Sequence, residues 1–373
     1  MLEDAGHKVG LIGTNQNLIG DEVIETERTT PESYELHALF ARMRDAGCTH
    51  VIMEVSSHSL VLDRVHGIPF AVGAFTNLTQ DHLDFHKTME DYVAAKAKLF
   101  KGLSFREHVK DNKTAVVNID DPWSKDILKA CQCKVLTYGV EKEADLRGSN
   151  LNVELKKSSF DVTGPFGSVH LNMNITGLFN VYNTLAAIGA AHAEGVDTEI
   201  IDSAIQTFHS VAGRFELVEA GQDFAIVVDY SHTPDSLEKA LTTARAMHPN
   251  RILAVFGCGG DRDRTKRPIM GKIAAEHADI PIVTSDNPRS EDPDAIVAEV
   301  EAGVKQGLKP GQHHEVIVDR RSAIQRAVEL AQTGDIIVIA GKGHETYQIL
   351  KDGTIHFDDR EEARKAVLAL KGR

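Results

Sequence analysis

The chain has 373 residues, which at about 150 residues per domain predicts two domains with some insertions. Hydrophobic residues make up 42% and charged residues 26% of it, a composition typical of a globular protein. Its 55 acidic residues outnumber its 41 basic residues by 14, which argues against nucleic acid as the main partner and against an anionic membrane surface. No apolar run reaches the roughly 20 residues of a membrane helix, so we expect a cytoplasmic protein.

The first six residues are typical of the last turn of a helix that ends at Gly6, and an apolar strand follows over residues 7–13. A domain rarely begins on the final turn of a helix, and this start lacks the basic and apolar regions of a signal peptide. We therefore expect further residues upstream. The four cysteines complete no zinc motif, and we expect buried free thiols in a reducing compartment.

The first half of the chain alternates strand and helix patterns, which predicts βαβ units and a mostly parallel sheet. The expected strands cover residues 7–13, 50–55, 72–76 and 114–119. The expected helices cover residues 31–46, 88–100, 177–193 and 198–208. Between them, residues 149–173 change to short alternating strands with glycine turns, which predicts a small antiparallel insertion.

A second alternating series begins near residue 211 and predicts a second α/β domain with its own sheet. Its expected strands cover residues 224–229, 252–256, 282–284, 315–318 and 335–340. Its expected helices cover residues 236–246, 269–277, 293–302 and 321–331. The sequence therefore predicts one domain over residues 1–210 and another over residues 211–373.

Polar or glycine-rich clusters follow six of the predicted strands. They are Glu54, Asn77, Asp229 and the segments 257–261, 286–289 and 341–345. In open α/β sheets, ligands bind beyond the carboxyl ends of the strands. This pattern predicts that these clusters form a site between the two domains.

Residues 81–86 read Asp-His-Leu-Asp-Phe-His and place four potential metal ligands within six positions. Carboxylate and imidazole ligands suit Mg²⁺, Mn²⁺ or Zn²⁺. A polar loop with a helix cap is the alternative interpretation of the same hexapeptide. Glu54 favours the metal, because a carboxylate that closes an apolar strand needs a partner such as a cation.

Lys96 falls on the apolar stripe of its predicted helix, between Tyr92 and Phe100 at spacings of four, whereas Lys98 falls on the opposite side. An unpaired lysine on a core-facing stripe has a lowered pKa. Its uncharged amine can react with CO₂, and the resulting carbamate can hold a metal. The alternative is a lysine whose stem is buried and whose ammonium reaches solvent.

Two segments supply arginines after glycine-rich or tight turns. The first, over residues 257–264, reads Gly-Cys-Gly-Gly-Asp-Arg-Asp-Arg, and the second, over residues 286–289, reads Asp-Asn-Pro-Arg. Guanidinium groups bind carboxylates through two hydrogen bonds, so these turns predict a carboxylated substrate. Residues 341–345 fail as a phosphate loop, because Lys342 is followed by glycine instead of serine or threonine, and the chain contains no Walker A motif.

These motifs together resemble the Mur ligases of peptidoglycan synthesis, and among them the diaminopimelate-adding type. The resemblance rests on segments 11–14, 29–31, 53–58, 75–79, 81–86, 94–96, 177–183, 213–216, 228–234, 257–268, 286–289 and 341–345. It implies a central ATPase-type domain over residues 1–210, with a mostly parallel sheet and the antiparallel insertion. It also implies a Rossmann-like C-terminal domain over residues 211–373 that binds the amino acid.

The resemblance further implies a mechanism. ATP phosphorylates the glutamate γ-carboxylate of UDP-N-acetylmuramoyl-L-alanyl-D-glutamate, and the amine of meso-diaminopimelate attacks the acyl phosphate. Mg²⁺ bridges the phosphates. The implied catalytic residues and metal ligands are Glu54, His82 and Lys96 as a carbamate.

The remaining implied residues bind the substrates. The nucleotide is assigned to Asn77, Asn180, Asn183, Arg214 and Asp229, and the UDP-linked substrate to Thr29, Thr30, Ser56 and Arg64. Diaminopimelate is assigned to Arg262, Asp286, Asn287, Pro288, Arg289, Gly341 and Glu345, with Glu345 on the distal ammonium. Lysine-adding members lack the arginine of Asp-Asn-Pro-Arg, in keeping with the second carboxylate that only diaminopimelate carries.

The chain departs from the family pattern at its start. The phosphate loop of the family, Gly-Thr-x-Gly-Lys-Thr-Thr, is expected just before residues 1–6, and the domain that holds the uridine nucleotide is expected before it. Neither is in this sequence, so we expect a monomeric ligase without its first domain. The alternatives are a non-catalytic remnant that binds diaminopimelate or its peptide, a lysine-adding ligase, and a metal-dependent hydrolase that uses residues 81–86. The DNA upstream of Met1 distinguishes the ligase from the remnant.

Overall fold

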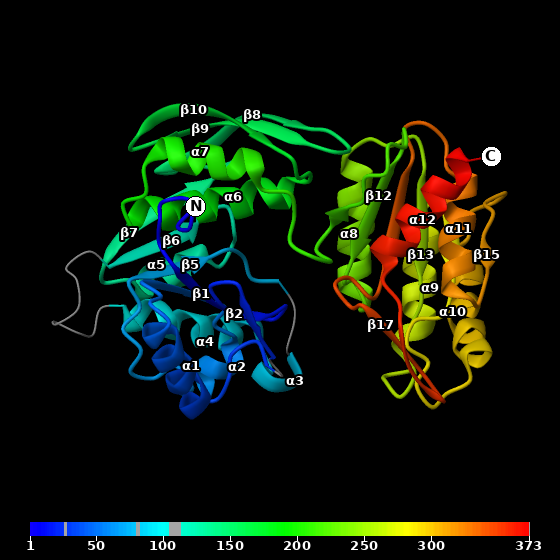
Figure 1. The fold of residues 1–373 in the computed structure, drawn as a ribbon, viewed down its shortest axis with the longest axis horizontal. Coiled ribbons are helices and arrows are strands. Elements are labelled where there is room, and N and C mark those ends of the chain that lie inside the picture. The colour runs from blue at the N-terminus through cyan, green and yellow to red at the C-terminus, as the bar shows by residue number, and fades with distance from the viewer. Residues whose placement is uncertain (26–27, 80–82, 104–112, 373) are drawn as a thin grey trace. The chain divides into compact units, whose positions relative to one another are not determined.

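The computed structural model describes residues 1–25, 28–79, 83–103 and 113–372. Contacts between its residues divide the chain into two compact units (Figure 1). The first unit contains Met1–Asn152, Ser159–Met173 and Leu178–Phe208, and the second contains Val153–Ser158, Asn174–Gly177 and His209–Arg373. Both units are α/β, so the expected fold class is confirmed.

The first unit contains two sheets with strand orders β3-β2-β1-β4 and β10-β9-β8-β7-β6-β5. The strands are β1 (Val9–Ile12), β2 (Asn17–Ile19), β3 (Glu22–Ile24), β4 (His50–Met53), β5 (Val72–Phe75), β6 (Thr114–Asn118), β7 (Lys134–Gly139), β8 (Leu146–Val153), β9 (Ser158–Gly164) and β10 (Gly167–Met173). The helices are α1 (Ser33–Asp45), α2 (Ser57–Val61), α3 (Leu83–His86), α4 (Met89–Gly102), α5 (Ser124–Ala130), α6 (Leu178–Ala193) and α7 (Thr198–Thr207).

Parallel pairing between predicted strands is present in the first unit. Strands β1 and β4 are parallel, as are β5 and β6, and β6 also pairs parallel with β7. The expected insertion does not stand apart from the sheet: β8 pairs parallel to β7, with Tyr138 opposite Leu146, and β9 and β10 extend the same sheet. The sequence prediction also missed β7 and the antiparallel pair of β2 and β3.

The predicted helix end at the start of the chain is present as a turn. The N–H of Ala5 donates to the Met1 carbonyl and that of His7 to the Leu2 carbonyl, both at 3.0 Å. Gly6 has a φ of +86°, a conformation that closes helical turns and that glycine adopts without strain.

The core of the first unit beneath α4 explains why that helix forms where the sequence predicts it. Thr88 caps its N-terminus, accepting a hydrogen bond from the N–H of Asp91 at 3.1 Å. Tyr92 and Phe100 on its apolar stripe are buried and pack with Phe75 of β5.

The second unit has one six-stranded sheet with the order β11-β12-β16-β13-β14-β15 and a separate hairpin of β17 and β18. The strands are β11 (Glu216–Leu217), β12 (Ala225–Asp229), β13 (Ile252–Phe256), β14 (Ile280–Val283), β15 (Glu315–Val316), β16 (Ile336–Ala340), β17 (Tyr347–Leu350) and β18 (Gly353–His356). The helices are α8 (Pro234–Ala246), α9 (Lys266–His277), α10 (Pro293–Gly307), α11 (Arg320–Leu330) and α12 (Asp359–Lys371).

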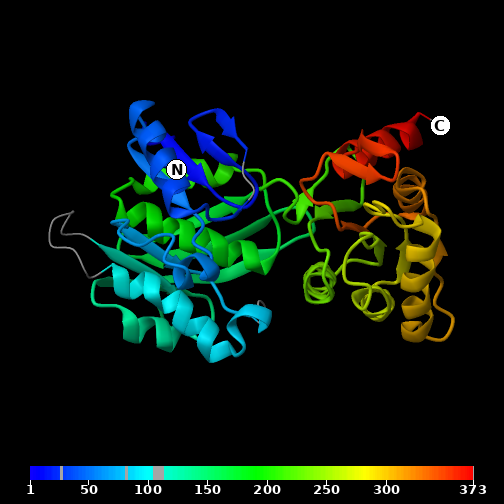
Figure 2. The ribbon, with the colours of Figure 1, turned by 90° about the horizontal axis from the view of Figure 1, so that it is seen from below.

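All strands of this sheet are parallel except β11 at one edge. Helices α11 and α12 pack on one face through Ile324 and Val367, whereas α8, α9 and α10 contact one another in sequence on the other face (Figure 2). The carboxyl ends of β12, β13, β14 and β16 therefore meet at one edge, which places their polar loops together.

The structure bears on two further expectations, which concern membrane-spanning helices and the burial of the cysteines. Among the described helices, none combines the length and the apolar surface that crossing a membrane requires. All four cysteines are free, but only Cys258 is buried, whereas Cys48, Cys131 and Cys133 are half-buried. The expectation of four buried thiols was therefore wrong for three of them.

Candidate active site

A polar cluster surrounds the end of β4 in the first unit. The Thr30 hydroxyl donates to the Glu54 carbonyl at 2.8 Å and accepts from the Ser56 N–H at 3.0 Å. Arg64 donates from its guanidinium to the Thr30 carbonyl at 3.3 Å, and its Nε is buried without a hydrogen-bond partner among the described residues. Three of the four residues assigned to the UDP-linked substrate therefore lie together.

The fourth residue, Thr29, joins the cluster through Thr14. The two threonine hydroxyls lie 3.0 Å apart, and Thr14 donates its hydroxyl to Glu54 Oε2 at 2.6 Å and its N–H to Oε1 at 3.3 Å. Glu54 is exposed. Its carboxylate therefore has solvent and Thr14 as partners in this structure, and its role as a metal ligand stays a prediction.

The predicted metal ligands are only partly within the described chain. His82 lies outside the described residues. Lys96 is half-buried, with its Nζ 5.2 Å from the centroid of the Tyr92 ring, and Lys98 is exposed as expected. Over the ranges that the structure describes, no three His, Cys, Asp or Glu side chains converge on a possible metal position.

His86, one of the four candidate ligands of the hexapeptide, is a core residue instead. It is 5% exposed, its Nε2 lies 2.7 Å from the Ser57 hydroxyl, and its ring stacks on Tyr92 at 4.8 Å between centroids. A metal ligand needs a free ring nitrogen facing the ion, whereas this side chain faces the interior. The other potential ligand side chains of the hexapeptide lie outside the described structure.

A pocket of about 270 Å³ opens at the carboxyl ends of β5, β6 and β7. Its lining contains Asn77 and Asn183, two of the predicted nucleotide residues. Asn180 lies beside it, with its Oδ1 3.4 Å from Asn183 Nδ2. The sequence prediction missed the other lining residues, which are Thr76, Asn118, Asp120, Asp121, Glu141, Phe179 and Tyr182.

Asp120 is the most strongly held carboxylate of this pocket. It accepts hydrogen bonds from the backbone N–H groups of Val140, Glu141 and Lys142 at 2.6 to 2.9 Å and from the Tyr182 hydroxyl at 2.9 Å. Burial opposes its ionisation, but these donors outweigh burial and lower its pKa. Burial and the bond to Asp120 raise the pKa of Tyr182, so the pocket pairs a carboxylate with a neutral hydroxyl.

In the second unit, the loops after β14 and β16 are joined by side-chain hydrogen bonds. Asn287 donates from Nδ2 to Glu345 Oε2 at 2.9 Å. The buried Lys342 donates to Asn287 Oδ1 at 2.9 Å and to Glu345 Oε2 at 3.2 Å. The structure therefore brings together two predicted amino-acid-binding residues and adds Lys342, which the sequence analysis considered only as part of a failed phosphate loop.

Gly341 is required where these loops meet. Its φ is +121°, and an added Cβ would lie 2.5 Å from Asp286 Oδ2. A side chain there would be strained and would displace Asp286. Asp286 and Gly341, which the sequence analysis assigns to the same substrate, therefore lie next to each other.

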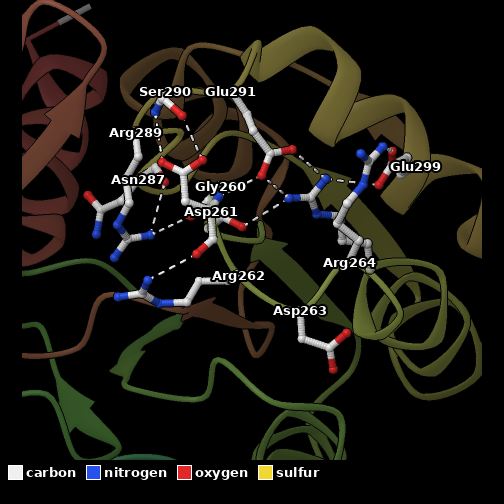
Figure 3. Close-up of polar contacts among 12 residues, drawn as sticks. Gly260, Asp261, Arg262, Asp263, Arg264, Asn287, Arg289, Ser290, Glu291 and Glu299 are labelled. Atoms are coloured by element: carbon white, nitrogen blue, oxygen red, sulfur yellow. Dashed lines mark hydrogen bonds and ion pairs between the residues drawn. The ribbon is translucent and has the colours of Figure 1, made fainter.

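Arg289 and Arg262 lie close together (Figure 3), and both approach Gly259. An added Cβ at Gly259 would lie 2.8 Å from Arg289 Nη1 and 3.8 Å from Arg262 Cγ. Arg289 has a φ of +54° and donates to the Gly260 carbonyl at 2.9 Å, and Arg262 is exposed and donates to the Asp261 carbonyl at 3.0 Å. Each guanidinium keeps further N–H groups for a ligand.

The neighbouring arginines are already paired with carboxylates. Arg267 is fully buried and bonds Glu291 at 2.8 Å and Glu299 at 2.9 Å. Arg264 also pairs with Glu299 (Figure 3). The hydrogen bonds of Arg267 and the N–H of Asp261 hold the pKa of Glu291 at about 2, so this cluster stays ionised and holds the glycine-rich loop.

The two predicted nucleotide residues of the second unit have different surroundings. Asp229 accepts the N–H of Phe215 at 2.7 Å and the N–H of Ser231 at 2.9 Å, so its carboxylate fixes backbone. Arg214 is exposed, with its guanidinium 5.3 Å from the centroid of the Tyr230 ring.

Comparison with known proteins decides the family. The model of the Mur ligase middle domain matches residues 1–191, and that of the Mur ligase glutamate ligase domain matches residues 213–343. The chain belongs to the Mur ligase family. The resemblance seen in the sequence is thereby confirmed.

Related Mur ligases cover nearly the whole chain. It is 48% identical over 365 residues to a UDP-N-acetylmuramoyl-L-alanyl-D-glutamate–2,6-diaminopimelate ligase of Syntrophomonas wolfei, covering 97% of this chain and 73% of the relative. The ligase of that name from Bacillus licheniformis is 48% identical over 367 residues, covering 98% and 74%.

Solved Mur ligase structures agree. A structure with the same ligase name has a TM-score of 0.72 at 36% identity, covering 99% of this chain and 74% of that one. The MurF ligase of Thermotoga maritima, solved in complex with ADP, shares the fold at a TM-score of 0.62 and 16% identity.

Proposed function

We propose that this chain is an ATP-dependent amide-bond ligase that adds meso-2,6-diaminopimelate to UDP-N-acetylmuramoyl-L-alanyl-D-glutamate in peptidoglycan synthesis. It works in the cytoplasm as a monomer, with residues 1–210 as the central domain and residues 211–373 as the amino-acid-binding domain. The observation that carries the proposal is the joined pair of loops in which Asn287 bonds Glu345 at 2.9 Å, beside two arginines that flank Gly259. Relatives at 48% identity bear the name of this ligase.

The chemistry of this pocket fits the distal end of diaminopimelate. That end carries one carboxylate and one ammonium group. Arg262 and Arg289 bind the carboxylate through paired N–H donors, and Glu345 accepts from the ammonium. Lysine presents the ammonium without the carboxylate, so it would leave both guanidinium groups without their partner. Asp286, Asn287, Pro288 and Gly341 shape the loops that hold these groups.

The pocket of the first unit fits the base and sugar of ATP. Asn77, Asn180 and Asn183 supply amide donors and acceptors, and Asp120 accepts from hydroxyl or amino groups. Its carboxylates would repel phosphates, which therefore lie outside the pocket. We also assign Arg214 and Asp229 to the nucleotide, as the family resemblance implies, with Asp229 acting through the backbone that it fixes.

The reaction balances as two steps. The glutamate γ-carboxylate attacks the γ-phosphorus of ATP, which forms the acyl phosphate and releases ADP. The deprotonated amine of diaminopimelate then attacks the acyl carbon, and phosphate leaves as the amide forms and loses a proton. Thr29, Thr30, Ser56 and Arg64 hold the UDP-linked substrate in the cluster around Glu54.

Glu54, His82 and Lys96 as a carbamate would hold Mg²⁺, which disperses phosphate charge when bound. Of these, the described structure supplies an exposed carboxylate at Glu54 and a half-buried amine at Lys96, which on their own do not make a three-ligand site.

A phosphate-release assay with the UDP-linked dipeptide, ATP and diaminopimelate tests the function. It uses this chain and a longer chain that includes the upstream codons. Arg289→Ala should lower kcat/KM for diaminopimelate about 10- to 150-fold, because a hydrogen bond to a charged group contributes about 1.5–3 kcal/mol. The KM for ATP should stay within about twofold.

Arg245→Ala is the matched control, because this exposed arginine pairs with Asp279 on the surface of the same unit. It should leave both constants unchanged. An equal loss for ATP and diaminopimelate in Arg289→Ala would contradict the assignment. Turnover without ATP would favour the hydrolase, and binding of diaminopimelate without turnover in either chain would favour the remnant.

A further inference from the structure

Lys342 is a fully buried lysine in the loop after β16, and no step of the proposed reaction uses it. Its side chain is 0% exposed, whereas that of its partner Glu345 is 15% exposed. A buried ammonium is strongly destabilising unless the protein replaces the water that it loses. Its partners therefore show what the residue does.

The ammonium is surrounded by groups of the amino-acid pocket. Lys342 Nζ donates to Asn287 Oδ1 at 2.9 Å and to Glu345 Oε2 at 3.2 Å, and it lies 5.6 Å from the centroid of the Tyr347 ring. An aromatic ring at this distance attracts a cation through its electron-rich face. Because these contacts hold the ammonium inside the second unit, Lys342 does not extend to a phosphate as a Walker lysine does.

These contacts fix which way the Asn287 amide points. The backbone N–H of Ile349 also donates to Asn287 Oδ1, at 3.0 Å, so this oxygen accepts from two donors. The amide nitrogen must then face the other way, and there it donates to Glu345 Oε2 at 2.9 Å. Without Lys342, the Ile349 N–H alone would hold this oxygen, and a flipped amide would set Asn287 Oδ1 against Glu345 Oε2, which repel each other.

The same contacts orient Glu345. Its Oε2 accepts from both Lys342 and Asn287, whereas its Oε1 takes part in no hydrogen bond with the described residues. Oε1 is therefore the oxygen presented to a ligand ammonium. The turn itself is closed by the Glu345 N–H, which donates to the Lys342 carbonyl at 3.0 Å.

We propose that Lys342 is the positioning residue of the amino-acid pocket: it fixes the Asn287 amide and the Glu345 carboxylate so that Glu345 Oε1 receives the distal ammonium of the amino acid. The inference rests on the proposed function. Lys342 does not touch the substrate and acts only through its two partners. Its loss therefore changes the affinity for the amino acid and leaves the affinity for ATP unchanged.

The first test replaces Lys342 by methionine, which keeps the length of the side chain and removes its charge. Lys342→Met should raise the KM for diaminopimelate about 10- to 150-fold, the effect of one hydrogen bond to a charged group. The KM for ATP should stay within about twofold. The control is Lys305→Met, because Lys305 pairs with Glu301 at 2.8 Å while 58% exposed, and it should change neither constant.

The second test asks whether Lys342 acts through Glu345. In a Glu345→Gln background, adding Lys342→Met should change the KM for diaminopimelate by no more than about twofold, because the carboxylate that Lys342 orients is gone. The double variant also removes both charges of the pair, so it remains measurable where Lys342→Met alone does not fold. Thermal unfolding of each variant reports which ones are folded.

Each outcome decides the proposal. A further loss of tenfold or more in the Glu345→Gln background would show a general structural role and overturn it. A parallel rise in the KM for ATP would overturn it as well. If the unmodified chains release no phosphate with diaminopimelate, the proposed function fails and the inference fails with it. If they turn over normally but the effects of Lys342→Met and Glu345→Gln are independent, only the inference fails.

Discussion

The ion pair of Arg320 and Asp359 gives the most quantitative prediction for stability. Both side chains are 0% exposed, and Arg320 bonds the carboxylate through Nε and Nη2, each at 2.7 Å. Nη2 also donates to the Ala340 carbonyl at 3.0 Å. The pair therefore links the starts of α11 and α12 to the end of β16, directly before the loop that contains Gly341.

Replacing Arg320 by methionine would leave the Asp359 carboxylate buried without a counterion. Breaking a buried pair from one side costs about 3–5 kcal/mol, against a total of about 5–15 kcal/mol for a folded domain. For a unit of this size, 1 kcal/mol shifts the melting temperature by about 2–4 °C, so we expect a decrease of roughly 6–20 °C. Arg245→Met breaks an exposed pair with Asp279 and should cost about 1 kcal/mol or less.

Urea unfolding followed by circular dichroism measures both variants. The single tryptophan, Trp123, lies in the first unit, so its fluorescence reports that unit separately. The double variant Arg320→Met with Asp359→Leu should recover most of the lost stability, because no uncompensated charge remains. The reasoning is refuted if Arg320→Met and Arg245→Met cost the same within about 1 kcal/mol, or if the double variant is less stable than Arg320→Met.

Two further predictions concern the loop after β16. Gly341→Ala should destabilise the protein by about 1–3 kcal/mol and raise the KM for diaminopimelate. The reason is that an added Cβ at a φ of +121° would lie 2.5 Å from Asp286 Oδ2. An unchanged KM in the phosphate-release assay would contradict the placement of this loop. Burial, followed by the charge of Arg214, lowers the pKa of His344 below 6.5. The unfolded chain then binds more protons, so stability present above pH 6.5 is lost as the pH falls below that value. Urea unfolding across this range should give a flatter profile for His344→Gln, and equal slopes would rule out this role.

The main strands could be predicted because they carry long apolar runs. Strands β12, β13 and β16 are five residues each and almost wholly buried, so composition alone identifies them. Strands β2 and β3 have three residues each, too few to establish an alternating pattern. The hairpin of β17 and β18 was missed for a different reason, since β18 is exposed along its whole length and has no apolar face.

Site residues could be predicted where the strand-end rule applies. That rule found Asn77, and applied consistently it would also have found Asn118, which ends β6, and Asp120 just after it. The rule cannot separate a ligand from a core residue. His86 lies within a metal-like sequence, yet its stacking on Tyr92 depends on how α3 and α4 pack.

The loop after β16 shows why its motif was hard to interpret. The sequence excluded a Walker loop because Lys342 precedes glycine, and the structure supplies the physical reason for that pattern. Gly341 is required beside Asp286, and Gly343 has a φ of +53° where an added Cβ would lie 2.7 Å from Tyr230 Cβ. With both neighbours so constrained, the Lys342 side chain enters the interior and meets Asn287, 55 positions earlier in the chain. The two glycines therefore accompany the burial of a lysine, and the role proposed for that lysine rests on a contact between two distant loops, which no local sequence pattern predicts.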